Sequence, residues 1–279
     1  MRADAGRLRG LAGAAVRFAI AALFLAPFLW VVLASFRAPG SLPPTAFAWI
    51  PDPLSLDAWA RLLTEVPTAR QLLASCLVAG VAVPAATVIA SLAGFAIAQL
   101  GGQAQRTFIA LAVVLLLVPA PALWLTRFLL FRVGGIVDTP LALILPAVAG
   151  VSPLLVLLAT WGFRRIPRAT IESARLDGAG PYRAWRSVAL PAVAPTTLAM
   201  AVLAFVATWG DAISPLLYLR TDAWTTLPLG LRALQVLDRT DWPILLAGAV
   251  LLALPAVVVF GIAQRRFLGD DRIAELIRG

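Results

Sequence analysis

A short run of small and charged residues stands out from an otherwise apolar chain of 279 residues. This run, residues 172–179, reads Glu172-Ser173-Ala174-Arg175-Leu176-Asp177-Gly178-Ala179, and Leu190-Pro191 follows after a short spacer. Small side chains let another surface approach closely, and the carboxylates of Glu172 and Asp177 can form charge-assisted hydrogen bonds. These residue types favour docking of a soluble partner over bond-making chemistry.

Several kinds of catalysis are excluded by composition. The chain has no histidine, which is the commonest general base and metal ligand, and all 23 of its basic residues are arginine. A nucleotide-binding phosphate loop requires a lysine, so this chain does not hydrolyse ATP by that route. Its one cysteine, Cys76, excludes an intrachain disulfide and a cysteine metal cluster. We therefore expect no enzyme activity, no metal site and no cofactor bound by this chain.

The elements that carry the run 172–179 are expected to be membrane-spanning helices. Hydrophobic residues make up 61% of the chain and charged residues 13%, which is too apolar for a soluble domain. A bilayer-spanning helix needs about 20 apolar residues, and its backbone must satisfy its own hydrogen bonds. Six uncharged stretches meet this length: Phe18–Phe36, Leu72–Ala98, Thr107–Thr126, Thr139–Phe163, Ser187–Gly210 and Pro243–Gln264.

The distribution of arginine predicts the orientation of these spans. With six spans both termini lie on one side, and that side carries fifteen of the 23 arginines, including those around Glu172. The positive-inside rule places this side in the cytoplasm. The net charge of +9 is thus explained by topology, without a nucleic-acid partner.

We accordingly predict an all-α polytopic membrane protein of six transmembrane helices, with a cytoplasmic helix between the fourth and fifth. A cytoplasmic N-terminal arm covers 1–17, a transmembrane domain covers 18–264, and a cytoplasmic tail covers 265–279. Within the transmembrane domain the polar segment is predicted at 164–191. The six spans are predicted at about 18–36, 72–98, 107–126, 139–163, 195–218 and 243–264.

The polar segment 164–191 is predicted to fold as two short helical pieces. Pro167 and Thr170 can open the first piece, with Thr170 as its N-cap, and Gly178 ends it. In the second piece Tyr182 and Trp185 share an apolar face that can lie at the bilayer surface. A surface-lying linker without a partner is the alternative, but the segment is far longer than a helical hairpin needs.

Prolines and one aromatic-polar cluster bear on a transport pathway. Proline removes a backbone donor and bends a helix, and the spans contain or adjoin Pro27, Pro84, Pro119, Pro121, Pro146, Pro153 and Pro255. As a set these residues fit a bundle of bent helices around a pathway. Thr208, Trp209 and Asp211 are candidate substrate contacts at the outer end of the fifth span, although an interfacial tryptophan beside a solvated aspartate is an equally good interpretation.

The polar segment resembles the EAA motif of ABC importer permeases, in which Glu-Ala-Ala is followed by a glycine and later by Leu-Pro and a further proline. Ser173 replaces the first alanine, and Ala74-Ser75 departs from the Asn-Ser that commonly opens the second span. The matching residues are Glu172, Ala174, Asp177, Gly178, Ala179, Leu190, Pro191 and Pro195. Four flanking segments are also similar to the family, the last three to its carbohydrate branch: Phe163–Pro167, Trp209-Gly210-Asp211, Thr226–Leu231 and Gln264–Phe267.

This resemblance implies that the chain is the six-span, maltose-type permease subunit of a bacterial carbohydrate importer in the cytoplasmic (inner) membrane. The motif would form a coupling helix that docks on an ATPase, with Glu172 as an ion-pair partner and Gly178 permitting the turn. The implied partners are a second permease subunit, two cytoplasmic ATPase subunits that hold ATP and Mg²⁺, and an extracytoplasmic substrate-binding protein. Transport would proceed by alternating access.

Three other functions are alternatives to sugar import. A permease for another solute, such as a polyamine or a glycerophosphodiester, fits the same motif. A secondary transporter would need ionisable groups at membrane depth for ion coupling, and the six uncharged stretches have none. A membrane-embedded enzyme would need a histidine or paired carboxylates at membrane depth, which this sequence lacks.

Overall fold

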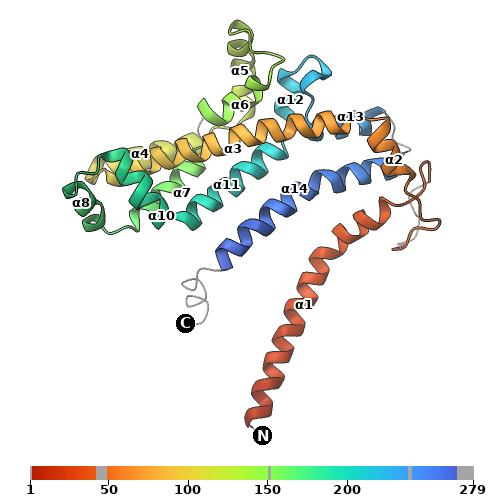
Figure 1. Ribbon diagram of the computed structural model, residues 1–279, viewed down its shortest axis with the longest axis horizontal. Coiled ribbons are helices and arrows are strands. Elements are labelled where there is room, and N and C mark those ends of the chain that lie inside the picture. The colour runs from red at the N-terminus through yellow and green to blue at the C-terminus, as the bar shows by residue number, and fades with distance from the viewer. Residues whose placement is uncertain (1, 42–48, 150–151, 238–240, 269–279) are drawn as a thin grey trace. The chain divides into compact units, whose positions relative to one another are not determined.

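The computed structural model describes residues 2–41, 49–149, 152–237 and 241–268, and its regular elements in these ranges are helices. Three of them are long and apolar enough to cross a membrane by themselves: Gly13–Ala34 within α1, Thr68–Gln99 (α3) and Trp242–Arg265 within α14. Figure 1 shows the course of these helices. The chain divides into two compact units, Met1–Thr68 with Leu231–Ala253, and Ala69–Gly230 with Leu254–Gly279.

The first unit is held together by a short amphipathic helix, α2 (Asp57–Thr64). Its Leu62 is fully buried against Ile244 and Ala247 of α14 (Trp242–Leu268). The indole of Trp59 donates a hydrogen bond to the Ser35 hydroxyl over 3.2 Å, just beyond α1 (Arg2–Ala34). On the same helix the guanidinium of Arg61 forms ion pairs with Glu65 and with the buried Asp241. A hydrogen bond therefore ties α2 to the end of α1, and apolar burial with an ion pair ties it to the start of α14.

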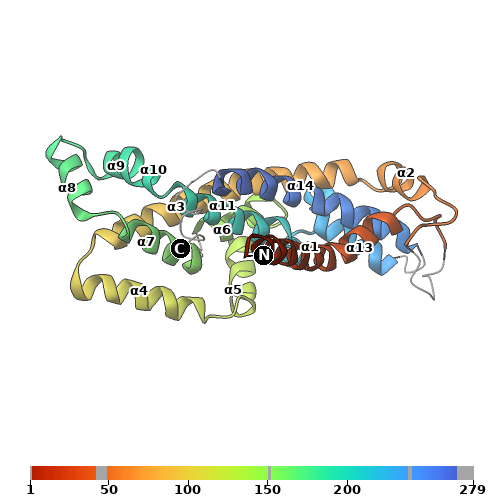
Figure 2. The ribbon, with the colours of Figure 1, turned by 90° about the horizontal axis from the view of Figure 1, so that it is seen from below.

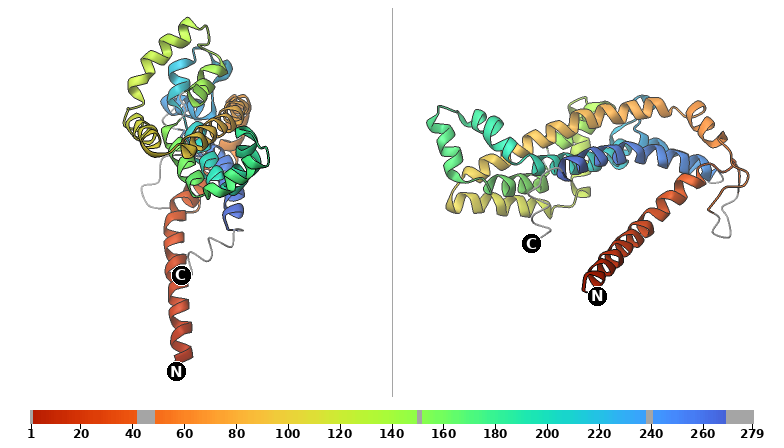
Figure 3. Two further views of the ribbon diagram at one scale, coloured as in Figure 1. Left: turned by 90° about the vertical axis from the view of Figure 1, so that its left-hand side faces the viewer. Right: turned by 60° about the horizontal axis from the view of Figure 1, so that its bottom comes forward.

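The second unit is built on α3 (Thr68–Gln99), the long orange helix of Figures 1 and 3. Its buried residues enter two apolar clusters, one containing Val78 and Ala82 and the other Ala86, Ala90 and Phe95. The first cluster packs against α6 (Pro140–Ala149) and α12 (Ile213–Tyr218), and the second against α7 (Pro153–Arg164) and α11 (Ala194–Trp209). One helix thus connects the packing of both parts of this unit.

Two glycines allow close approach between helices of the second unit. A Cβ added to Gly94 of α3 would lie 2.4 Å from the Ala159 Cβ of α7. A Cβ added to Gly162 of α7 would lie 2.9 Å from the Thr196 side chain of α11. Such short distances leave no room for a larger residue, so α7 is packed tightly between α3 and α11. Small residues at helix contacts are the usual basis of packing in membranes, where no hydrophobic force drives the helices together.

Three of the uncharged stretches fold as bent helix pairs. α4 (Gly102–Leu116) and α5 (Pro121–Val133) meet at 92°, α6 and α7 meet at 43°, and the pieces Pro181–Ala192 and Ala194–Trp209 meet at 89°. The predicted span 107–126 therefore contains a sharp break rather than one straight helix. Pro119 and Pro121 explain this break, since neither can donate the backbone hydrogen bond that would continue α4. Within the described residues there are up to six candidate spans if each bent pair counts as one span.

Asp138 joins two loops of the second unit. It has a positive φ of 65°, and its Oδ1 accepts hydrogen bonds from the backbone amides of Arg220 and Thr221 at 2.9 and 3.0 Å. Its Oδ2 accepts a third from the Thr221 hydroxyl at 2.9 Å, and its own amide donates to the Tyr218 carbonyl. The Arg220 and Thr221 amides, with the Thr221 hydroxyl, lower the pKa of Asp138 below its usual value because they stabilise the carboxylate.

We expect this contact to weaken in acid. A carboxyl group with a lowered pKa in the folded state stabilises the fold above its ordinary value of 3.8, and this stabilisation is lost as pH falls through the lowered pKa. Hydrogen exchange of the Arg220 and Thr221 amides, corrected for intrinsic rates, should show protection at neutral pH that decreases toward about pH 3. An Asp138→Ala variant should lack the protection at every pH. Equal protection in this variant would show that the carboxylate does not hold the loop.

Candidate functional site

The coupling segment, defined here as residues 164–191, follows α7 and precedes α11. It contains α8 (Arg168–Leu176), α9 (Pro181–Ala184), one π-helical turn at Trp185–Ala189 and α10 (Leu190–Ala192). The predicted two helical pieces are thus present. Figure 2 shows α8 at the end of the second unit, with α9 and α10 leading back toward α11.

The first piece begins earlier than predicted. α8 starts at Arg168 with Pro167 as the preceding residue, and the amide of Thr170 already donates to the Pro167 carbonyl at 3.0 Å. The interpretation of Thr170 as the N-cap was therefore wrong. Pro167 is held in an extended conformation, with φ of −56° and ψ of 135°, which suits the residue just before a helix.

The end of α8 has the hydrogen-bond pattern of a Schellman motif. The Ala179 amide donates to the Ala174 carbonyl at 2.9 Å, and the Gly178 amide donates to the Arg175 carbonyl at 3.0 Å. The residue between the helix and Ala179 must be left-handed, and Gly178 has a φ of 81°. No atom lies within 4 Å of a Cβ built on Gly178, so its backbone conformation, and not crowding, requires glycine there.

The motif residues divide into an outer and an inner set. Glu172, Ser173, Asp177 and Gly178 are exposed, whereas Ala174 and Ala179 are half-buried where the two ends of the turn meet. Leu190 is half-buried and Pro191 is exposed, in the last turn before the break at Val193. The side chain of Glu172 makes no hydrogen bond or ion pair within the part of the chain that the structure describes. Its carboxylate is therefore available to another molecule.

Buried side chains fix the coupling segment to the transmembrane helices. Ile171 of α8 is 3% exposed and joins the apolar cluster that includes Phe95 of α3 and Phe163 of α7. Those two rings meet edge to face with centroids 5.3 Å apart. Trp185 is also buried there, and its indole nitrogen donates to the Ser91 hydroxyl of α3 over 3.0 Å. Tyr182 is 61% exposed, and its ring lies beside that of Trp185 with centroids 5.4 Å apart, so the two rings share one face as the sequence predicted.

This arrangement mechanically joins both pieces of the coupling segment to α3. Ile171 contributes from the first piece, and Trp185 with Ala189 from the second. Because packed interiors are dense and respond to displacement as units, a force on α8 is passed to α3, α7 and α11. The sequence did not reveal Ser91 or Phe95 as members of the site, since neither stands in a motif. The one available signal was a serine inside an uncharged span.

Removing the Trp185 hydrogen bond should destabilise this core. A Trp185→Phe variant leaves the buried Ser91 hydroxyl without its donor, at an expected cost of about 1–3 kcal/mol in the free energy of unfolding, plus the loss of packed volume. The matched Ser91→Ala change should recover part of this loss in the double variant, because the orphaned hydroxyl is gone. Thermal unfolding in detergent would give the stability of the wild type, the two single variants and the double variant. A double variant as unstable as the sum of the single variants would contradict the pairing.

The three candidate substrate residues do not converge on one pocket. Thr208 of α11 is half-buried and lines a hollow of about 410 Å³ with Pro146 and Ser152. Trp209 is buried and stacks on Phe205, with ring centroids 5.3 Å apart, beside a different pocket. Asp211 lines neither.

The carboxylate of Asp211 has a local structural role. Its Oδ1 accepts hydrogen bonds from the amides of Ile213 and Ser214 at 2.9 and 3.0 Å. These are amides of the first turn of α12, which have no partner inside the helix, so Asp211 acts as its N-terminal cap.

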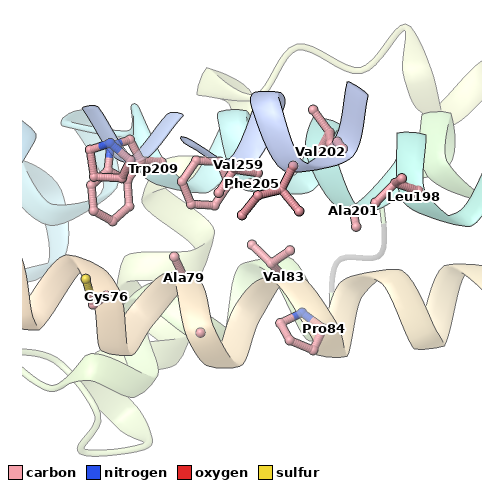
Figure 4. Close-up of a pocket in the computed structure, with 14 residues that line it drawn as sticks. Cys76, Ala79, Val83, Pro84, Leu198, Ala201, Val202, Phe205, Trp209 and Val259 are labelled. Atoms are coloured by element: carbon pink, nitrogen blue, oxygen red, sulfur yellow. The ribbon is translucent and has the colours of Figure 1, made fainter. Parts of the chain in front are cut away.

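The pocket beside Trp209 was not anticipated from the sequence. It measures about 460 Å³, lies between α3, α11 and the end of α14, and has an almost entirely apolar lining (Figure 4). Cys76, Ala79 and Val83 contribute from α3, facing Phe205 and Val259 in the close-up. Because a sugar needs hydrogen-bond partners for its hydroxyl groups, this lining does not suit a carbohydrate. The pocket instead offers a surface for apolar groups.

Comparison with solved structures defines the class of protein. The chain is similar to the crystal structure of a bacterial ABC transporter involved in the import of the acidic polysaccharide alginate, with a TM-score of 0.74 and 17% identity over 94% of this chain and 97% of that one. It is also similar to a bacterial alginate ABC transporter in complex with alginate pentasaccharide-bound periplasmic protein, with a TM-score of 0.62 and 13% identity. The chain thus shares its fold with a chain of a bacterial ABC importer, which confirms the predicted all-helical membrane fold.

Sequence comparison then identifies the family. Residues 5–267 match the binding-protein-dependent transport system inner membrane component, and the chain belongs to this family. It is 31% identical to the arabinooligosaccharides transport system permease protein of Halalkalibacterium halodurans, over 89% of this chain and 90% of that protein. It is 27% identical to the trehalose permease protein of Mycobacterium tuberculosis, over 88% and 89%, and to the maltodextrin permease protein of Streptococcus pneumoniae, over 87% and 86%.

Family membership confirms the resemblance and three predictions made from the sequence. The chain is a multi-pass component of the inner membrane, it is the permease of its transporter, and it is not the catalytic component. It groups with permeases of carbohydrate uptake.

Proposed function

We propose that this chain moves a sugar or oligosaccharide across the inner membrane as one of two permease subunits of an ABC importer. The observation that carries the proposal is the EAA-like run 172–179, folded as an exposed helix-turn between two spans of an importer-permease fold. The substrate class is supported by the relatives, whose names include arabino-oligosaccharide, trehalose and maltodextrin transport.

The coupling segment would transmit the ATP cycle of a separate subunit. Glu172, Ser173, Asp177 and Gly178 present the exposed surface for the ATPase, and Ala174 with Ala179 closes the turn behind it. Leu190 and Pro191 end the second piece before the chain turns by 89° into α11. ATP and Mg²⁺ are held by the ATPase subunits, whose closure would drive the permease from inward-facing to outward-facing.

The bent helices of the second unit suit alternating access. Proline interrupts backbone hydrogen bonding within α3, α6 and α14, at Pro84, Pro146 and Pro255. Helix segments on either side of such a break can rotate with little loss of hydrogen bonding. Two arrangements of the same packed bundle, biased by nucleotide on the partner, would then expose the pathway to one side at a time.

The remaining partners and the substrate contacts are part of the same proposal. A second permease subunit of different sequence, two ATPase subunits and an extracytoplasmic binding protein would complete the transporter. Thr208 and Trp209 remain proposed pathway residues, and Asp211 would contribute through α12, which it caps. In a transporter of two different permeases, the second subunit can supply most of the sugar contacts.

Reconstitution tests the substrate class. The chain would be purified with its second permease and ATPase, placed in vesicles, and supplied with its binding protein and labelled solutes. ATP-dependent uptake is expected for an arabino-oligosaccharide, trehalose or a maltodextrin. The alternative is an anionic glycerol derivative, because the sn-glycerol-3-phosphate permease protein of Rhizobium meliloti is 29% identical over 71% of this chain. Uptake of glycerol 3-phosphate but of none of the sugars would replace the carbohydrate assignment.

We further propose that both termini are cytoplasmic, with an arm at 1–17, a permease domain at 18–264 and a tail at 265–279. The excess of arginine in 164–191 and at both ends of the chain supports this topology. A reporter enzyme that works only in the cytoplasm, fused after Gly279, should therefore show activity. Activity confined to a reporter that requires the extracytoplasmic side would reverse the orientation.

A further inference from the structure

A polar cleft separates α8 from the ends of the neighbouring spans. It measures about 320 Å³ and is lined by residues of α8, of the last turns of α3 and α7, and of the first turn of α4. Figure 2 shows these helix ends together on its left-hand side. Its polar lining is supplied by the side chains of Gln99, Gln105, Arg164, Arg168, Glu172 and Arg175. The lining of this cleft is thus polar, whereas that of the pocket beside Trp209 is apolar. Of the residues that line the cleft, only Glu172 has a role in the proposed docking of the ATPase.

The charges of this cleft are not balanced within the chain. Three guanidinium groups line it with one carboxylate, and the side chains of Arg164, Arg168 and Glu172 form no hydrogen bond or ion pair with any residue in the described ranges. Arg175 donates one long hydrogen bond, 3.4 Å, to the amide oxygen of Gln99. The cleft therefore has an excess of positive charge and many unused donors, which is the character of an anion site.

The helix ends beside the cleft do not use these arginines. The last turn of a helix leaves carbonyl groups without partners, and a nearby arginine often satisfies them. At the end of α3 the Gln105 side-chain nitrogen does so instead, donating to the carbonyls of Ile97, Ala98 and Leu100 at 3.0, 3.3 and 3.1 Å. The arginines thus remain available for a group from outside the chain.

The position of the cleft selects the kind of anion. Gln99 is the last residue of α3 and Arg164 is the last residue of α7, so the cleft opens where two apolar helices end. Beyond the hydrocarbon core of a bilayer lies the headgroup layer, whose phosphates are at this depth. Arginine forks match phosphate oxygens in a bidentate manner, and juxtamembrane arginines attract anionic headgroups.

We propose that this cleft binds a phosphate group, with Arg164 and Arg168 as its principal donors. A phosphodiester of an anionic phospholipid is the source that its depth favours, and a soluble phosphate compound would present the same oxygens. Glu172 at the rim restricts the site to a single phosphate, because a second would meet its carboxylate. Bound phosphate would hold α8 against α3 and α7 through charge, beside the apolar contact made by Ile171.

Lipid binding can be measured without transport. The complete transporter would be purified from nanodiscs containing phosphatidylglycerol or only phosphatidylcholine, and the lipid it retains would be counted by native mass spectrometry. An Arg164→Gln/Arg168→Gln variant should bind phosphatidylglycerol more weakly, by roughly fivefold for each arginine. Arg183→Gln/Arg186→Gln is the matched control, because these exposed arginines of the same segment lie outside the cleft. Its loss of phosphatidylglycerol should be smaller than that of the cleft variant, because arginines outside a cleft attract a headgroup only through surface charge.

Inorganic phosphate, titrated at constant ionic strength, distinguishes the two sources. Stabilisation of the wild type but not of the cleft variant by inorganic phosphate, with equal lipid retention, would support a soluble ligand for the same site. Equal lipid retention and no phosphate effect in all proteins would overturn the proposal. Weaker co-purification of the ATPase with unchanged lipid would also overturn it, because the cleft would then be filled by an acidic group of that subunit. Neither readout depends on uptake, so failure of the carbohydrate assignment would leave the result interpretable.

Discussion

A Gly178→Trp permease is expected to insert into the membrane normally and to lose ATP-driven uptake, to below about a tenth of the wild-type rate. Gly178 has a φ of 81°, and a residue with a Cβ pays roughly 1–2 kcal/mol to adopt this left-handed conformation. The Schellman hydrogen bonds from Gly178 and Ala179 would be strained, and the indole would project into the open space beyond the turn. The ATPase should therefore dock poorly for two reasons: the turn is distorted, and the indole obstructs the surface on which the ATPase would sit. Uptake into reconstituted vesicles and the ATPase rate would be measured together.

The chain supplies close controls for this experiment. Gly180, two residues later, has a φ of −64° and open space around its Cβ, so Gly180→Ala should transport normally. Gly178→Ala carries the conformational cost without the bulk, and Gly178→Asn should be milder because asparagine tolerates the left-handed region. The expected order of uptake is Gly180→Ala, Gly178→Asn, Gly178→Ala and then Gly178→Trp. Normal uptake by Gly178→Trp would exclude this turn as the docking surface.

Reversing the charge of Glu172 should have an effect of similar size. Its carboxylate is exposed and unpaired among the described residues, yet it stands in a segment rich in arginine. Loss of a charge partner at an interface commonly costs about 2–5 kcal/mol, so Glu172→Arg should weaken co-purification of the ATPase by more than tenfold. The new guanidinium would also face Arg168 and Arg175 around the cleft.

A neutral change separates charge from shape at this position. Glu172→Gln keeps the size of the side chain and should give an intermediate loss of ATPase binding. Glu65→Gln, at an exposed glutamate directly after α2 in the other unit, is the matched control and should bind the ATPase normally. Restoration of binding by a reversed charge on the ATPase would identify the partner residue. Unchanged uptake with Glu172→Arg would remove Glu172 from the docking surface.

Local signals predicted a large part of the fold. Uncharged stretches identified the membrane helices because a helix that crosses the lipid needs about 20 consecutive, mostly apolar residues. α3 illustrates this, since the predicted stretch Leu72–Ala98 falls inside the observed Thr68–Gln99. Pro119 and Pro121 indicated a bend between α4 and α5. Its angle of 92° depends on how the helices pack, and two prolines alone do not predict it.

Prediction of the candidate site succeeded where neighbouring residues determine geometry. Glycine after a short helix is typical of a Schellman motif, and Gly178 ends α8 in this way. The start of α8 was misplaced because Thr170 is a good capping residue in isolation, while the conformation of Pro167 decided the boundary. Asp211 was interpreted as a pathway residue because its side chain is charged near an interface. Only the fold shows that two amides of α12 engage its carboxylate.

The sequence alone determined that this is a multi-span membrane protein and that residues 172–179 form its exposed, chemically distinctive helix-turn. Both conclusions follow from composition and from residues adjacent in the chain. The tertiary structure alone decided what the helix-turn is attached to. Ser91 and Trp185 are 94 residues apart, and the arginine cleft draws on three helices as well as α8, so no local pattern records either of them. Such contacts depend on how helices pack, and packing is a property of the whole bundle.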